Sequence, residues 1–114
     1  MEKNHTEEYI NKVKTTSEGL KPNENIFVST NDVYLNNHTF SAAKLSADAC
    51  LTAVTDVLDD NSPLERGYCI IRPPGHHCKH DTYDGFCFFN NVALAAKAAV
   101  SQGKKVLIFD WDVH

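Results

Sequence analysis

The sequence predicts an α/β domain with a partial parallel sheet and flanking helices, and three features of its C-terminal half carry that prediction. Residues 68–71 (YCII) and 106–109 (VLIF) are continuous apolar runs, which are typical of strands buried on both faces. Between them, the alanine-rich segment 91–102 predicts a helix that stops at Gly103. A strand, a helix and a second strand in this order form a right-handed crossover with parallel strands.

The N-terminal half adds shorter elements. Residues 1–25 are polar apart from a small apolar patch, and they predict one frayed helix that ends near Gly19. Two short apolar runs, at 26–28 and 33–35, predict short strands. From residue 41 to residue 59, alanine, valine and leucine recur at steps of three and four, which predicts an amphipathic helix.

Composition limits the classes of partner. The 114 residues suffice for one modest domain. Fifteen acidic side chains against eleven basic ones give a net charge of −4, so we expect no direct contact with nucleic acid. No apolar run approaches the roughly 20 residues that cross a bilayer, and the polar N-terminus lacks a signal core, so we expect no membrane contact and an intracellular location, in nucleus or cytoplasm. The four cysteines are expected to be reduced thiols.

A long loop between the first apolar run and the alanine-rich helix carries much of the polar chemistry. It covers residues 72–89, about 18 positions where 2–6 are usual, and long loops at the carboxyl ends of parallel strands often hold the sites of α/β proteins. His76 and His77 are adjacent in this loop, and imidazole exchanges protons readily near neutral pH. A solvated polar loop is the alternative interpretation.

The last five residues form a second polar group. Asp110, Asp112 and His114 alternate with Trp111 and Val113, and side chains two apart on an extended segment point the same way. Two carboxylates and an imidazole suit Zn²⁺, Fe²⁺ or Mn²⁺. We expect Asp112 and His114 to hold a metal and Asp110 to orient an imidazole, for metal-assisted hydrolysis of an amide or related bond. A strand-end cluster that binds nothing is the alternative.

Three motifs resemble the zinc-dependent histone deacetylases, most of all the class II branch with its tubulin and polyamine deacetylases. They are RPPGHH at 72–77, GFCFFNNVA at 85–93 and VLIFDWDVH at 106–114, in the family's order. The resemblance covers about residues 25–114. Residues 1–25 form a polar segment outside the resemblance. For residues 26–114 the resemblance implies the incomplete N-terminal part of a catalytic domain with the arginase/deacetylase three-layer fold.

The resemblance also implies roles for single residues. Asp112 and His114 correspond to zinc ligands, and His76 and His77 to the histidines that handle protons. Asp110 corresponds to the carboxylate that hydrogen-bonds the first histidine and helps to hold a structural potassium ion. The implied reaction removes acetyl groups from lysine side chains. Because the third zinc ligand and the catalytic tyrosine have no counterpart in the sequence, we expect no appreciable activity from this chain alone.

Substrate contacts are implied in the same way. Phe86, after Gly85, corresponds to one aromatic wall of the tunnel for the lysine stem, and Asp32 lies near a rim position that binds substrate backbone. The implied substrates are acetylated histone or tubulin tails or an acetylated polyamine, and co-regulator proteins are compatible partners. Cys78 and His80 depart from the family pattern, and we interpret them as local loop variation in preference to a second metal site.

Two other functions stay open. A non-catalytic chain with the family's surface helices would act as a binding or dominant-negative module. A manganese hydrolase of the arginase type shares the sheet and the Asp-x-Asp-x-His pattern, but the histidine pair and the segment 85–87 (GFC) argue against it.

Overall fold

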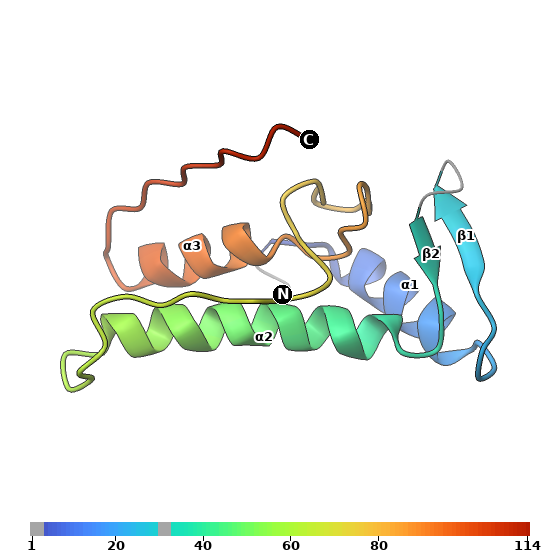
Figure 1. Cartoon of the computed structure of the whole chain (residues 1–114), viewed down its shortest axis with the longest axis horizontal. Coiled ribbons are helices and arrows are strands. Elements are labelled where there is room, and N and C mark those ends of the chain that lie inside the picture. Colours follow the sequence, from blue (N-terminus) through green and yellow to red (C-terminus); the bar gives the residue numbers. More distant parts are fainter. Residues whose placement is uncertain (1–3, 30–32) are drawn as a thin grey trace.

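The computed structural model describes residues 4–29 and 33–114, and its elements gather along one long helix (Figure 1). In chain order they are α1 (Glu7–Glu18), β1 (Ile26–Ser29), β2 (Val33–Leu35), α2 (Thr39–Leu58) and α3 (Asn91–Ser101). Helix α3 packs on α2, and α1 and the two strands lie toward the N-terminal end of α2. None of the helices in the described part of the chain is long and apolar enough to cross a membrane.

Helix α1 has clear local signals at both ends. The Thr6 side chain accepts a hydrogen bond from the Tyr9 N–H at 3.1 Å, which caps the helix start. At the other end, the Gly19 N–H binds the Thr15 carbonyl at 3.0 Å, so the predicted end near Gly19 is confirmed. Tyr9 and Val13 lie one turn apart and are buried, so this polar segment contributes to the hydrophobic core.

Strands β1 and β2 lie where the two short apolar runs predict strands, and they form an antiparallel pair. Ile26 pairs with Leu35, and Phe27 pairs with Tyr34. Side chains alternate along β2, where Val33 and Leu35 are buried and Tyr34 is exposed, because successive side chains of a strand point to opposite faces. The predicted rim residue Asp32 lies outside the described residues.

The two helices that cover the core follow their sequence signals. Helix α2 confirms the amphipathic prediction. At α3, the Asn90 side chain accepts the Ala93 N–H at 3.0 Å, and Gly103 follows the last turn with a φ of +76°. Together with α1, β2 and the loop before α3 they enclose one cluster of buried apolar residues. It consists of Tyr9, Val13, Val33, Leu35, Ala43, Ala47, Cys78, Cys87, Phe88, Phe89 and Leu94.

The segments 68–71 and 106–109 differ from the prediction of buried, paired strands. Both are extended and run in the same direction, opposite to α3 (Figure 1), but neither forms strand pairs within the described residues. Tyr68 and Leu107 are each 90% exposed, so the expected burial on both faces is wrong for this chain. Both segments line one cavity of about 620 Å³. Strands that share ladder hydrogen bonds lie only about 4.8 Å apart, and these two segments form no such ladder within the described residues.

Candidate active site

The loop that carries the histidine pair is pressed against the start of α3. The Cys78 N–H binds the Gly75 carbonyl at 3.1 Å, and this turn contains both histidines. A Cβ atom at Gly75 would lie 2.5 Å from the Asn91 nitrogen and 2.7 Å from the Phe89 carbonyl oxygen. Only glycine therefore permits this close approach, which fixes how near the histidine loop lies to the start of α3.

A second tight turn lies against the histidine pair. Asp84 and Cys87 exchange backbone hydrogen bonds of 3.2 and 2.7 Å around Gly85 and Phe86, whose φ angles are +47° and +66°. Positive φ at both central residues is the requirement of a type I′ turn. A Cβ at Gly85 would lie 2.4 Å from Cδ2 of His77, so this glycine is required by its backbone and by the imidazole. Phe86 carries its ring outward, 58% exposed, on strained backbone.

His76 joins this loop to the C-terminal segment. Its Nδ1 lies 2.8 Å from Oδ2 of Asp110, and its Nε2 lies 3.6 Å from Oδ2 of Asp112. The rings of His76 and His77 stand side by side, with centroids 4.2 Å apart and planes tilted by 56°. Thirty-four positions separate His76 from Asp110 in the chain, so the fold brings together the histidine pair and the C-terminal polar group.

The C-terminal segment presents its polar side chains on one side. The Asp110 carboxylate accepts the Asp112 N–H at 3.1 Å, and the Asp112 carboxylate accepts the His114 N–H at 2.9 Å. On the other side, the rings of Phe109 and Trp111 meet edge to face at 6.2 Å. The hydrogen bond from His76 lowers the pKa of Asp110, and the His114 N–H lowers the pKa of Asp112. Both carboxylates are therefore ionised at neutral pH.

The metal-binding capacity of this segment is partial. Asp112 and His114 supply a carboxylate and an imidazole, and His114 Nδ1 lies 3.4 Å from Asp112 Oδ1. Within residues 4–29 and 33–114, no group of three or more His, Cys, Asp or Glu side chains is arranged to hold a metal ion. A catalytic zinc takes three protein ligands. The described residues alone do not fit a complete zinc site.

Cys78 and His80 have structural surroundings. Cys78 is 4% exposed, its thiol donates to the Phe88 carbonyl at 2.9 Å, and burial raises its pKa to about 11. Such a thiol is protonated and unreactive at neutral pH. The His80 Nδ1–H donates to the Asn4 carbonyl at 2.7 Å. Both residues thus tie the loop to its surroundings, which favours loop variation over a second metal site.

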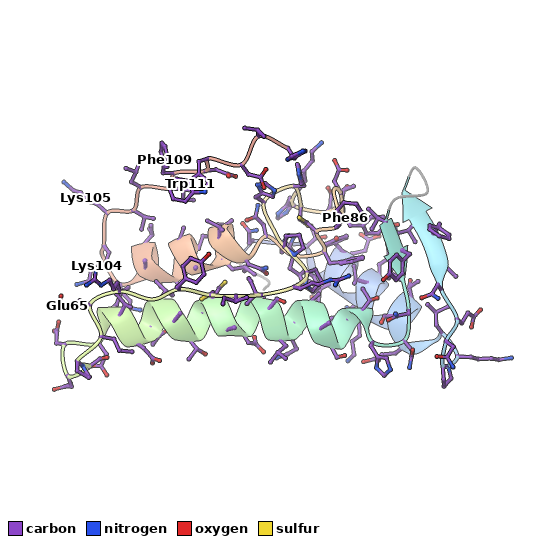
Figure 2. The ribbon with its side chains drawn as sticks, in the orientation of Figure 1. Glu65, Phe86, Lys104, Lys105, Phe109 and Trp111 are labelled. Carbon is purple, nitrogen blue, oxygen red and sulfur yellow. The ribbon has the colours of Figure 1, made fainter. Side chains whose placement is uncertain are left out.

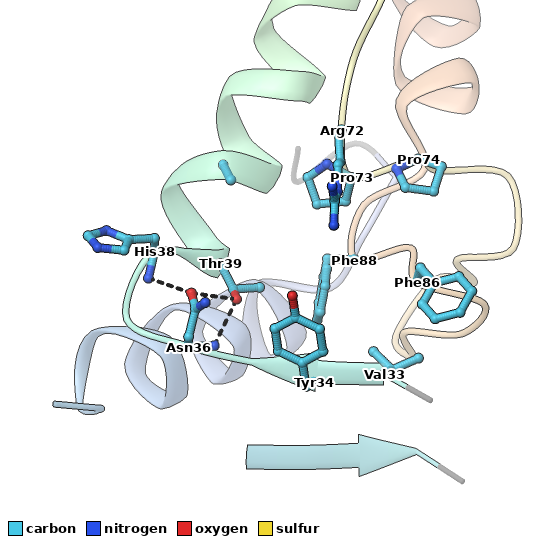
Figure 3. A pocket seen from close by; sticks show the side chains of 11 residues that line it. Val33, Tyr34, Asn36, His38, Thr39, Arg72, Pro73, Pro74, Phe86 and Phe88 are labelled. Atoms are coloured by element: carbon cyan, nitrogen blue, oxygen red, sulfur yellow. Dashed lines mark hydrogen bonds between the residues drawn. The ribbon is translucent and has the colours of Figure 1, made fainter. Parts of the chain in front are cut away.

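A cavity of about 610 Å³ opens beside the loop (Figure 3). Its wall comes from β2, the first turn of α2 and the Arg72–Pro74 stretch, and it is largely apolar, with Tyr34, Phe86 and Phe88 as its aromatic members. Pro74 also lines the cavity that contains His76 and Asp110. The predicted wall residue Phe86 therefore borders apolar space next to the polar centre, as a sleeve for an aliphatic chain requires.

The sequence analysis missed two residues that hold the loop, His5 and Tyr9. His5 is 1% exposed and Tyr9 is 3% exposed. The Tyr9 hydroxyl donates to the Phe88 carbonyl at 2.8 Å, and both nitrogens of His5 contact backbone atoms of the loop. One signal was available: Tyr9 and Val13 are four residues apart, which places both side chains on one face of α1, and His5 lies four residues before Tyr9.

The sequence and the fold match known proteins along the chain. The family model of the histone deacetylase domain matches residues 1–114 and so includes the first 25. Histone deacetylase 15 of Arabidopsis thaliana is 41% identical over 111 residues, which are 96% of this chain and 19% of that protein. The polyamine deacetylase HDAC10 of Danio rerio is 41% identical over 114 residues, 96% of this chain and 16% of that protein.

A solved structure agrees with these matches. The crystal structure of the HDA15 HD domain superposes with a TM-score of 0.85 at 40% identity, over 98% of this chain and 30% of that domain. The fold described above is therefore the fold of one part of such a domain, and the chain spans less than a third of the solved structure and less than a fifth of these two curated relatives.

Proposed function

Because the chain belongs to the histone deacetylase family, we propose that it contributes the proton-transfer part of a zinc-dependent site that hydrolyses acetyl-lysine amides and releases acetate. The observation that carries this proposal is the 2.8 Å contact between His76 Nδ1 and Asp110 Oδ2. It pairs an imidazole with an ionised carboxylate across two distant motifs, the arrangement by which hydrolases hold a general base.

The geometry gives His76 a defined protonation form. The Asp110 carboxylate accepts the Nδ1–H, so Nε2 is the nitrogen that takes up and releases the proton of the reaction. Nε2 faces Asp112, at 3.6 Å, so the proton is handled next to the predicted metal ligands. His77, with its ring beside that of His76, is the second proton carrier.

The metal is the second part of the proposal. Zn²⁺ would be held by Asp112 and His114 together with donors that the described residues do not provide, and a structural K⁺ would lie near Asp110. When bound, zinc supplies a Lewis acid that polarises the amide carbonyl. With two ligands where a catalytic zinc takes three, residues 1–114 alone are expected to have no appreciable turnover.

The substrate is an acetylated amine on a narrow aliphatic stem. Phe86 and Gly85 supply one wall of its sleeve, and the strained turn holds the Phe86 ring outward, where a stem could pass it. Candidate substrates are acetyl-lysine in histone or tubulin tails and acetylated polyamines, since both histone and polyamine deacetylases occur among the relatives. Asp32 is proposed to bind substrate backbone at the rim. The protein is placed inside the cell, in nucleus or cytoplasm, with co-regulator proteins as further partners.

A non-catalytic binding role is the second candidate, and one surface favours it. Ile70 is 91% exposed, Phe109 77% and Trp111 85%, and Figure 2 shows the last two on the segment after α3. Exposed apolar side chains in such a row are typical of surfaces that another polypeptide covers. In that role the chain would associate with deacetylase subunits and lower their activity without turnover of its own.

Because residues 1–114 alone are expected to have no appreciable turnover, Asp110→Asn tests the proposed function in a protein that carries these residues within a complete histone deacetylase domain (the intact protein). Asparagine keeps the shape of the side chain but removes the charge that holds the His76 tautomer, so kcat on an acetyl-lysine peptide should fall by about 10²–10⁴-fold. Asp60→Asn, at an exposed carboxylate after α2, is the matched control and should keep wild-type activity. Turnover that is absent in the wild type, or equal in both variants, or unaffected by a zinc chelator, would contradict the proposal.

A further inference from the structure

His5 is a buried imidazole with a single tautomer. It lies just before α1, and its Nε2 is 3.0 Å from the backbone nitrogen of Asn90, while its Nδ1 is 3.1 Å from the carbonyl oxygen of His80. A backbone N–H can only donate, so Nε2 is the acceptor, and Nδ1 carries the hydrogen that is donated to His80. Both bonds require neutral histidine in the Nδ1–H form, and burial lowers the pKa of His5, which favours that form.

Both partners of His5 follow the histidine pair in the chain. His80 follows the histidine pair by three positions, and Asn90 begins α3. The Asn90 side-chain amide donates to the Cys78 carbonyl at 3.1 Å, directly after His77. One imidazole from the N-terminal segment therefore connects two parts of the loop, at His80 and at Asn90, through hydrogen bonds.

Tyr9 strengthens the same anchor. Its hydroxyl donates to the Phe88 carbonyl at 2.8 Å, two residues before Asn90. The His5 ring packs on the rings of Tyr9 and Phe89, with centroids 5.6 and 5.5 Å away. Aromatic side chains and hydrogen bonds together hold His5, so its position is well defined. Its hydrogen bonds to His80 and Asn90 then fix the position of the loop.

We propose that His5 is a positioning residue for deacetylation, which holds the two-histidine loop in the position where His76 contacts Asp110. This inference rests on the proposed function. His5 touches neither His76 nor Asp110 in the described contacts, and it acts through Asn90 and His80. Residues that orient a reacting group commonly change activity by about 10–100-fold, and a displacement of about 1 Å at a reacting atom can cost about 100-fold.

Kinetics of three variants of the intact protein separate positioning from stability. His5→Phe keeps the ring but removes both hydrogen bonds, and it should lower kcat by about 10–100-fold with KM within about twofold. His5→Gln retains an acceptor and a donor and should restore most of kcat. Val13→Ala, a buried apolar truncation in α1, is the control that lowers the melting temperature and leaves kcat per folded molecule unchanged.

The opposite result is equally clear. If His5→Phe lowers the melting temperature but leaves kcat per folded molecule at the wild-type value, as Val13→Ala does, the positioning role is wrong. The same holds if His5→Gln recovers folding but none of the lost kcat, since the hydrogen bonds would then not matter.

Nitrogen-15 NMR of the imidazole is a readout that does not depend on turnover. His5 should show a protonated Nδ1 and an unprotonated Nε2 at neutral pH, with the Asn90 amide protected from exchange in the wild type and released in His5→Phe. An Nε2–H tautomer, or imidazolium at neutral pH, would contradict the hydrogen bonds by which His5 holds His80 and Asn90. If the wild type shows the expected tautomer but no deacetylation, the proposed function fails while the anchor itself stands.

Discussion

The histidine loop and the C-terminal segment each carry half of the candidate site, but they are held in different ways. In the loop, Cys87 and Phe89 are at most 1% exposed, and the N-terminal segment anchors its backbone. In the C-terminal segment, Leu107 and Trp111 are 90% and 85% exposed, and strand pairing is absent from what is described of it. The described residues therefore fix the loop that is proposed to transfer protons, whereas the C-terminal segment that is proposed to hold the metal keeps its apolar side chains exposed.

This contrast has a physical cause. A loop can be held in place by local turns, by glycines and by a few buried hydrogen bonds. The described residues of this chain supply all three. An extended apolar segment is stabilised by strands on its two edges and by layers on its two faces. The polar contact from His76 to Asp110 aligns the segment at one point, but it does not bury its apolar side chains.

The largest expected effect concerns the metal side. Asp112→Ala in the intact protein should remove bound zinc and reduce turnover to the background, because the carboxylate is one of the predicted ligands. Metal analysis of the purified variant, together with a deacetylation assay, measures both losses. Full zinc content in Asp112→Ala would show that the C-terminal segment does not hold the metal.

A loop variant should behave in the opposite way toward the metal. His77→Ala should lower turnover by about 10²–10⁴-fold while zinc stays bound, because it removes a proton carrier and no ligand. The same metal analysis decides between the two outcomes. Loss of zinc in this variant would show that His77 is needed to bind the metal, and the proposed separation into proton carriers and metal ligands would be wrong.

A smaller effect is expected from the turn that supports His77. Gly85→Ala adds a Cβ that collides with the His77 ring, on backbone with a positive φ, and should cost about 1–2 kcal/mol of stability and lower kcat. Gly103→Ala is the matched control, because Gly103 also has a positive φ but has no atom within 4 Å of an added Cβ. If the two variants lose equal activity per folded molecule, contact with the imidazole is irrelevant.

The smallest effect is a pH dependence of stability. Burial lowers the pKa of His5 in the folded state, so the unfolded chain binds more protons below the ordinary histidine pKa of about 6.5. The contribution of His5 to the free energy of unfolding should therefore be fully present above that pH and should decrease as the pH falls below it. Denaturant titrations of the wild type and of His5→Gln measure the difference, and an unchanged slope in the variant would mean that another group is responsible.

Sequence alone determined the elements whose signals are local. The Asn90 cap and Gly103 bound α3, the two short apolar runs form β1 and β2, and the periodic segment forms α2. The motifs also identified the family, because three short patterns in a fixed order are improbable by chance. The pairing of Asp110 with the first histidine was implied by the family resemblance, and His76 Nδ1 lies 2.8 Å from Asp110 Oδ2.

Only the tertiary structure decided the contacts between distant residues. His5 looks like one polar residue in a polar segment, and its role depends on Asn90, which lies 85 positions away. The segments 68–71 and 106–109 have strand composition, but pairing and burial depend on what lies beside them, and within the described residues both segments line one cavity without pairing. Hydrophobicity along the chain reports what a residue prefers to contact, whereas its actual neighbours are set by the packing of the whole fold.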